Sequence, residues 1–427
     1  MGESYFAAHG QDVAAGTYRF LANDEVIVAG DSLTDGNYGG GGYIWGLALA
    51  RSPVIVAFNA GKAGDTIQQL WTRWPTDVTA KTPKAVLTRI GTNNVDASST
   101  TDITSFVAAY QPIIDWHVSN GKRGLIYALP PEGTVLTEAA GIKARNDWLA
   151  AQCAAHPSLL AYVQDSTGIG DSEYRAVAAY YVNEVPAVHM NSLGRRTQGE
   201  AMAAALVAAF GQAESRLLDA TDTYSQNSGS TQYAVNPHNA GTAGTTNNAT
   251  YCTGTIPSNW LVHLYYGLTT TVCSKPAADG GDACQAPWFR VNFPSSAAAN
   301  AQVTLFHDLQ HPAFTDQIAD LEALNVCIEA RFVNFDASKW DSLELSVEGA
   351  GYAEPFYKTI YGLGFAKTLN ETVLLKHGLP RNQYTWMTIA AVAANTLKLR
   401  LRLVSAAGFS GGAGSIDFRC QSARKRV

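Results

Sequence analysis

The sequence predicts a doubly wound α/β domain followed by an antiparallel β-sandwich. Between about residues 24 and 211, short apolar runs alternate with longer segments of helical period, which is typical of a parallel sheet covered on both faces. Residues 221–250 then shift to Ser, Thr, Asn, Gly and Gln, which indicates a linker or an extended packing strap. Strand-like runs separated by turn residues follow. These changes predict an N-terminal extension at 1–23, the α/β domain at 24–215, the linker at 216–250 and the sandwich at 251–427.

Apolar runs bounded by Gly, Pro, Asn or Asp mark the expected strands of the α/β domain, which are Val26–Ala29, Val54–Phe58, Ala85–Ile90, Leu125–Leu129 and Leu160–Val163. The expected helices are Tyr43–Ala50, Thr66–Trp74, Ile103–Val118, Leu136–Ala155 and Ser192–Phe210. In such sheets the functional residues lie in loops beyond the carboxyl ends of the strands. The residues directly after each strand are therefore the first candidates for a functional site.

The sandwich is expected to contain the strands Trp260–Tyr266, Trp288–Phe293, Gln302–His307, Val326–Phe335, Ser342–Val347, Tyr384–Ala390, Thr396–Val404 and Ser415–Arg419. Within the seventh strand, Leu397–Leu403 alternates between leucine and a basic residue. We expect the leucines to be buried and the basic face to be exposed to water. Most aromatic residues of this half are expected in the core, and some could stack on sugar rings.

Composition excludes several classes of protein. The chain has 30 Lys and Arg against 36 Asp and Glu, a net charge of -6, so a broad basic surface for nucleic acid is not expected. No apolar run approaches the length of a membrane span. Charged residues make up 15% of the chain, against about 25% in an average protein, and this favours uncharged partners such as neutral sugars. Because no signal peptide is visible, we expect an extracellular protein whose signal was removed, or one carried on a virion.

A candidate nucleophile follows the first expected strand. Gly30-Asp31-Ser32-Leu33 places a serine on the tight turn between that strand and a Gly-rich segment, where a nucleophile would be exposed. The simpler interpretation is that Ser32 only caps a strand-to-helix turn.

Loops after other strands supply matching groups. Gly64 follows the second strand and Asn93 follows the third, and both offer N–H donors of the kind that stabilise a developing oxyanion. His189 lies just before the last helix, on the same edge of the sheet. The nucleophile and a base could therefore meet there.

Taken together, these segments resemble the blocks of the GDSL family of serine esterases and lipases, also called SGNH hydrolases. The resemblance covers roughly residues 24–211 and includes four short blocks in the family order. It implies a flavodoxin-like three-layer α/β/α fold. It also implies that Ser32 is the nucleophile, that His189 is the general base, and that Ser32 N–H, Gly64 N–H and the Asn93 side chain form the oxyanion hole. No cofactor is required.

The sequence departs from the family pattern at two positions. Family members usually carry Asp three residues before the histidine, where this chain has Pro186. Glu184, on the same loop, is the favoured substitute as the acid that orients the imidazole. Asp165, Asp171 or a backbone carbonyl in a Ser–His dyad remain alternatives. The second departure is Asn94, where the family often has Asp; that position is usually structural, so we expect the change to be tolerated.

The predicted function is hydrolysis of O-acetyl esters on a polysaccharide, with an acylated glycan or a small ester as substrate. The end of the chain loosely resembles the closing strands of jelly-roll carbohydrate-binding modules. One alternative is a lipase or thioesterase of the same family. Another is a glycan-binding attachment protein whose hydrolase domain has decayed. No metal site is expected, because Pro312 argues against a helix that could pair His307 with His311. The six cysteines could form disulfides or remain buried thiols.

Overall fold

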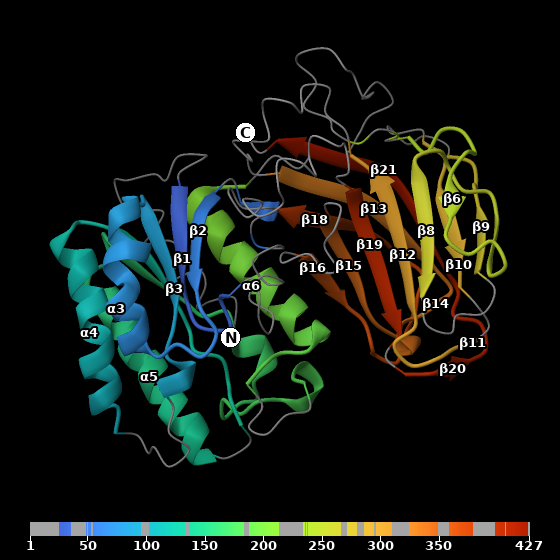
Figure 1. Ribbon diagram of the computed structural model, residues 1–427. Coiled ribbons are helices and arrows are strands. Elements are labelled where there is room, and N and C mark those ends of the chain that lie inside the picture. Colours follow the sequence, from blue (N-terminus) through green and yellow to red (C-terminus); the bar gives the residue numbers. More distant parts are fainter. Residues whose placement is uncertain are drawn as a thin grey trace. The chain divides into compact units, whose positions relative to one another are not determined.

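The chain folds into two compact units in the computed structural model, Met1–Glu214 and Ser215–Arg426 (Figure 1). Each unit is considered separately below. The structure describes residues 25–35, 48, 50–52, 54–94, 102–133, 136–182, 188–212, 234, 236, 238–265, 271–279, 286–293, 296–309, 324–348, 358–378, 398–405 and 407–425.

The first unit contains a parallel five-stranded sheet in the order β2-β1-β3-β4-β5. The strands are β1 (Glu25–Gly30), β2 (Ile55–Gly61), β3 (Ala85–Arg89), β4 (Arg123–Tyr127) and β5 (Leu160–Val163). Each overlaps a strand predicted from the sequence. This order is that of a flavodoxin-like doubly wound sheet, in which ligands bind beyond the carboxyl ends of the strands.

Helices cover both faces of this sheet (Figure 1). They are α3 (Ile67–Asp77), α4 (Thr104–Ser119), α5 (Leu136–Ala155) and α6 (Ser192–Phe210), with 3-10 turns at Thr79–Lys81, Thr92–Asn94, Thr167–Ile169 and Ala178–Tyr180. Buried residues of α3, α4 and α5 share one core cluster with Ile27, Ala29 and Val86. The helix α6 lies on the other side (Figure 1). Most of the predicted helix Tyr43–Ala50 lies outside the described residues.

Three tryptophans pack together in the first unit. The ring centroids of Trp74 and Trp116 are 5.3 Å apart in an edge-to-face arrangement, and those of Trp71 and Trp74 are 6.0 Å apart. Trp74 is fully buried. Since such aromatic pairs add to the free energy of burial, this cluster fixes α3 against α4.

Within the described residues, the second unit is a mostly antiparallel β-sandwich with two six-stranded sheets. One sheet has the order β18-β13-β21-β10-β9-β7 and the other has the order β16-β15-β19-β12-β8-β6. Their strands are β6 (Thr245–Thr246), β7 (Cys252–Gly254), β8 (Trp260–Tyr265), β9 (Thr271–Ser274), β10 (Phe289–Asn292), β12 (Gln302–Asp308), β13 (Leu324–Val333), β15 (Trp340–Glu348), β16 (Lys358–Gly362), β18 (Thr372–Gly378), β19 (Lys398–Ser405) and β21 (Ser415–Lys425). Two-residue strands form two small sheets, β11 (Ser296–Ala297) with β20 (Phe409–Ser410), and β14 (Phe335–Asp336) with β17 (Thr368–Leu369), and a 3-10 turn spans Ala337–Lys339. The predicted fold class, a parallel α/β domain followed by a two-sheet β domain, is confirmed.

Several of the aromatic residues in this unit belong to its core. Trp260, Trp288 and Trp340 are each at most 1% exposed, so none of these three can present a face to a sugar. Trp288 packs against two guanidinium groups, with Arg331 4.1 Å and Arg419 3.9 Å from its ring centroid. The predicted strand Tyr384–Ala390 lies outside the described residues.

Most of the basic face predicted for Leu397–Leu403 is buried, whereas the Lys398 side chain at its start is 34% exposed. Arg400 and Arg402 are 5% and 9% exposed. Arg402 Nε donates to Glu344 Oε2 at 2.8 Å, and Lys358 Nζ lies 3.4 Å from the same oxygen. Although burial opposes ionisation, these cations hold the pKa of Glu344 below its usual value. From Leu399 to Leu403 the alternation therefore marks two buried faces, one apolar and one ionic.

The described end of the Ser/Thr/Asn/Gly-rich segment packs on the sandwich. The Asn239 side chain is fully buried, donates to Phe418 O at 2.8 Å and accepts from Trp260 Nε1 at 2.8 Å. The described cysteines Cys153, Cys252, Cys273 and Cys327 are buried free thiols. No helix within the described residues is long and apolar enough to cross a membrane.

Candidate active site

Ser32 lies on a tight turn at the carboxyl end of β1. The amides of Thr34 and Asp35 both donate to Asp31 O, at 3.0 and 2.9 Å, and Leu33 N–H donates to Asp31 Oδ1 at 3.0 Å. The turn needs glycine just before it, because a Cβ on Gly30 would lie 2.0 Å from Arg89 O. Ser32 itself is 5% exposed. The local sequence therefore fixes the serine at the edge of the sheet where ligands of this fold bind.

His189 reaches the same point from the start of α6. The amide of Val182 donates to His189 O at 3.0 Å, and Asn191 caps the helix by accepting from Gly194 N–H at 3.1 Å. His189 Nε2 lies 3.1 Å from Ser32 Oγ. With the ring proton on Nδ1, the serine hydroxyl can donate to Nε2, which is the arrangement that activates a serine for attack.

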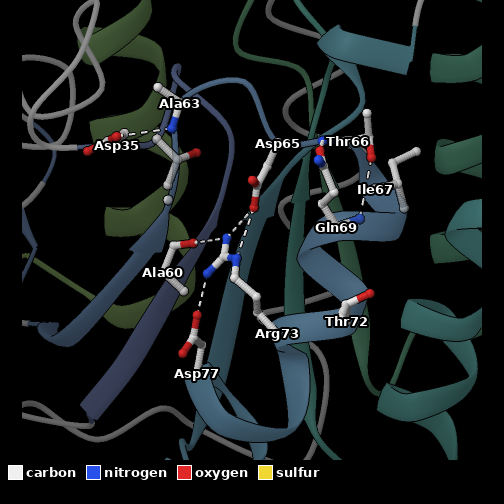
Figure 2. Close-up of polar contacts among 12 residues, drawn as sticks. Asp35, Ala60, Ala63, Asp65, Thr66, Ile67, Gln69, Thr72, Arg73 and Asp77 are labelled. Atoms are coloured by element: carbon white, nitrogen blue, oxygen red, sulfur yellow. Dashed lines mark hydrogen bonds and ion pairs between the residues drawn. The ribbon is translucent and has the colours of Figure 1, made fainter.

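The loop after β2 holds Gly64 near the end of β1. Lys62 N–H donates to Gly30 O at 3.0 Å. Figure 2 shows the next contact, in which Ala63 N–H donates to Asp35 Oδ2 at 3.0 Å. Gly64 has a φ of 81°, while a Cβ at this position would meet no heavy atom within 4 Å. Glycine is therefore favoured by backbone conformation rather than by lack of room.

Asn93 and Asn94 have separate partners. Asn93 Nδ2 donates to Asp65 O at 2.8 Å, which ties this side chain to the residue directly after Gly64. Asn94 Oδ1 accepts from Ile67 N–H at 2.8 Å, and its Nδ2 donates to Gln68 Oε1 at 2.8 Å. An aspartate at position 94 could accept the first bond but could not donate the second. The Asn94 side chain therefore stabilises the first turn of α3.

Glu184 and Pro186, the two positions that bear on the orientation of His189, lie outside the described residues. The two upstream alternatives are held elsewhere. Asp165 is fully buried, pairs with Arg89 and accepts from Ser166 Oγ at 3.0 Å. Asp171 accepts from Arg175 Nε at 2.7 Å and from Glu173 N–H at 2.9 Å.

Two buried carboxyl groups that interact with each other, Asp31 next to Ser32 in the chain and Glu132 after β4, were not singled out from the sequence. Burial raises the pKa of Asp31 to about 6, opposed by Leu33 N–H and the Arg89 guanidinium. Burial, with the charge of Asp31, raises the pKa of Glu132 to about 8, opposed by the Thr92 hydroxyl and Arg145. Glu132 follows β4, so the rule that found the other loops also applied here. At neutral pH, Asp31 is ionised and Glu132 holds a proton.

This pair makes the free energy of unfolding depend on pH. Because the folded-state pKa of Glu132 is raised above its unfolded value, stability is lost as pH rises from about 4.5 toward about 8. Glu132→Gln removes the titration, so we expect it to raise the free energy of unfolding by about 2–4 kcal/mol at pH 8.5 and to change little at pH 5. Thermal melts of both proteins at the two pH values measure this. An equal effect at both pH values would contradict it.

Comparison with known proteins identifies the family of the domain that carries this site. Residues 28–197 match the GDSL-like lipase/acylhydrolase family. The chain therefore contains a GDSL-like lipase/acylhydrolase domain, which makes it a carboxylic ester hydrolase. A search of curated proteins found no match.

Several solved structures resemble part of the chain. A lipolytic protein of the G-D-S-L family from Desulfitobacterium hafniense DCB-2 is 20% identical over 43% of this chain and 100% of its own, with a TM-score of 0.36. A variant of an acetyl-xylooligosaccharide esterase from Geobacillus is 18% identical over 44% and 96%, with a TM-score of 0.37. An acetyl xylan esterase is 22% identical over 43% and 99%, with a TM-score of 0.35.

Proposed function

We propose that Ser32 and His189 hydrolyse O-acetyl esters on a polysaccharide through an acyl-enzyme. The observation that carries the mechanism is the 3.1 Å separation between Ser32 Oγ and His189 Nε2. Ser32 Oγ attacks the carbonyl carbon of the ester while its proton passes to His189 Nε2. The imidazolium then gives this proton to the departing sugar oxygen, which leaves the acetyl group on Ser32.

Water completes the reaction. His189 takes one proton from a water molecule as the water oxygen attacks the acetyl carbon, and this proton then returns to Ser32 Oγ as acetic acid departs and ionises in water. In both halves the carbonyl oxygen becomes negatively charged. The donors proposed for this oxygen are Ser32 N–H, Gly64 N–H and one N–H of Asn93 Nδ2. The other N–H of Asn93 Nδ2 donates to Asp65 O.

We propose Glu184 as the carboxylate that orients His189. It lies five residues before the histidine, and Pro186 cannot supply a carboxylate. The bonds of Asp165 to Arg89 and of Asp171 to Arg175 leave these two carboxylates engaged elsewhere. Both contacts favour Glu184, or a backbone carbonyl, over the upstream aspartates.

The substrate class is argued from the rest of the chain. A β-sandwich accompanies the hydrolase domain, and only 15% of residues are charged. Both features suit a neutral, extended substrate such as an acetylated glycan better than a charged or strongly apolar one.

The test measures acetate release from a panel of acetylated polysaccharides, beside p-nitrophenyl esters of increasing chain length. The native chain is compared with Ser32→Ala and Glu184→Gln. We expect acetate release that disappears in Ser32→Ala. Turnover that rises with acyl chain length would instead indicate a lipase or thioesterase. No Ser32-dependent turnover of any ester would contradict the enzyme and favour the glycan-binding alternative.

A further inference from the structure

Arg73 connects three elements around the loop that carries Gly64 (Figure 2). From α3, its Nε and Nη2 donate to Asp65 Oδ2 at 2.9 and 2.6 Å, and Nη2 also donates to Ala60 O at 3.0 Å. Its Nη1 pairs with Asp77 on the same helix. One planar group therefore joins the helix, the loop and the end of β2.

Asp65 is the residue through which this connection reaches the site. Its side chain is 5% exposed, against 24% for Asp77. Its main-chain oxygen accepts from Asn93 Nδ2 at 2.8 Å. The peptide before it begins at Gly64, whose φ of 81° places it in the left-handed region. Asp65 thus lies between the two groups that we assign as oxyanion donors.

The helix α3, which carries Arg73, is anchored to the core by its apolar face and capped at its start. Ile67, Leu70 and Trp74 are each at most 1% exposed and pack in the core of the unit. At its start, Thr66 Oγ1 accepts from Gln69 N–H at 3.3 Å, and Gln69 Oε1 accepts from Thr66 N–H at 2.8 Å. This reciprocal cap makes the helix a rigid support for the loop in front of it.

We propose that Asp65, held by Arg73, is a positioning residue that sets the Gly64 N–H and the Asn93 amide toward the oxyanion. This inference rests on the proposed Ser32 mechanism. Asp65 orients Asn93 by occupying one of its two amide hydrogens, so the other is held in one direction. Since an oxyanion donor acts only when it is aimed at the transition state, displacement of this loop lowers kcat more than it raises KM.

The test compares Asp65→Asn with Asp77→Asn. Each removes one carboxylate charge facing Arg73, but only Asp65 belongs to the loop. We expect Asp65→Asn to lower kcat about 10–100-fold, the size expected for donors misplaced by about 1 Å, with KM changed less than about threefold. Asp77→Asn should leave kcat within about twofold, because it removes an i,i+4 pair on the helix surface.

A transition-state analogue separates positioning from loss of folding. An alkyl boronic acid forms a tetrahedral adduct with an active serine, so its inhibition constant should rise by the factor by which kcat falls. If Asp65→Asn does not fold, Arg73→Lys serves instead, since one ammonium cannot reproduce the two-nitrogen contact with Asp65. An unchanged inhibition constant, or equal effects of Asp65→Asn and Asp77→Asn, would overturn the inference. Absence of Ser32-dependent activity in the native chain would contradict the proposed function itself.

Discussion

Replacing Ser32 with alanine is expected to lower kcat for ester hydrolysis by about 10⁴-fold or more, because the acyl-enzyme can no longer form. His189→Ala should lower kcat by a similar factor, since we propose that Ser32 Oγ and His189 Nε2, 3.1 Å apart, act as one unit. The double variant should be no slower than either single variant. Initial rates on p-nitrophenyl acetate at pH 7.5 measure all three.

A serine outside the site provides the control. Ser338 lies in the second unit, where its hydroxyl donates to Asp336 Oδ1 at 2.6 Å. Ser338→Ala should keep the native rate. If the losses from Ser32→Ala and His189→Ala multiplied in the double variant, the two groups would be acting independently, which is incompatible with a shared proton transfer.

Asp165→Asn is expected to lower the free energy of unfolding by about 3 kcal/mol, because it removes the ion-pair partner of the buried Arg89 guanidinium and leaves Asp31 as the other carboxylate that acts on it. Both side chains of this ion pair are fully buried. Burial lowers the pKa of Arg89 to about 10, which still leaves it charged at neutral pH. Denaturant unfolding at pH 7, followed by tryptophan fluorescence, measures the change.

Asp171→Asn is the matched control for this prediction. Asp171 pairs with Arg175, and the two side chains are 29% and 36% exposed. An exposed pair contributes little, so the change should be below about 1 kcal/mol. If Asp165→Asn were as mild as Asp171→Asn, the Arg89 guanidinium would not depend on Asp165 for its compensation.

The first unit was predicted well because strands of a parallel sheet are buried on both faces and form continuous apolar runs. The prediction for β4 was shifted toward the C-terminus. It included Ala128 and Leu129, which are fully buried but follow the strand. An apolar run indicates which residues are buried. Because the buried residues continue into the loop beyond β4, the run does not indicate where the strand ends.

The second unit was predicted less completely. β16 and β18 were not predicted, because Lys358 and Thr359 are polar yet buried, and Thr372–Gly378 has no strict alternation. Such strands form through neighbours distant in the sequence, such as the Lys358–Glu344 pair across β16 and β15. A local pattern contains no information about these partners.

The residues of the candidate site also fall into two groups, those that the sequence predicts and those that only the structure reveals. Ser32, Gly64, Asn93 and His189 follow from a rule about strand ends and from four short motifs. The Arg73–Asp65 contact spans eight residues, which in a continuous helix would be about 12 Å of rise, beyond the i,i+3 and i,i+4 spacings at which side chains meet. The contact forms because Asp65 lies in the loop before the helix, and only the structure shows that the loop brings Asp65 next to Arg73.

The packing of Trp71, Trp74 and Trp116 has an optical consequence. Indole rings 5.3–6.0 Å apart have coupled electronic transitions, so this cluster should contribute a paired positive and negative band to the circular dichroism spectrum. Among the described tryptophans of the second unit, Trp260 packs on Phe289, Trp340 packs on Phe293, and Trp288 packs against guanidinium groups. The paired band would therefore report the folding of the α/β unit while the intact chain is heated.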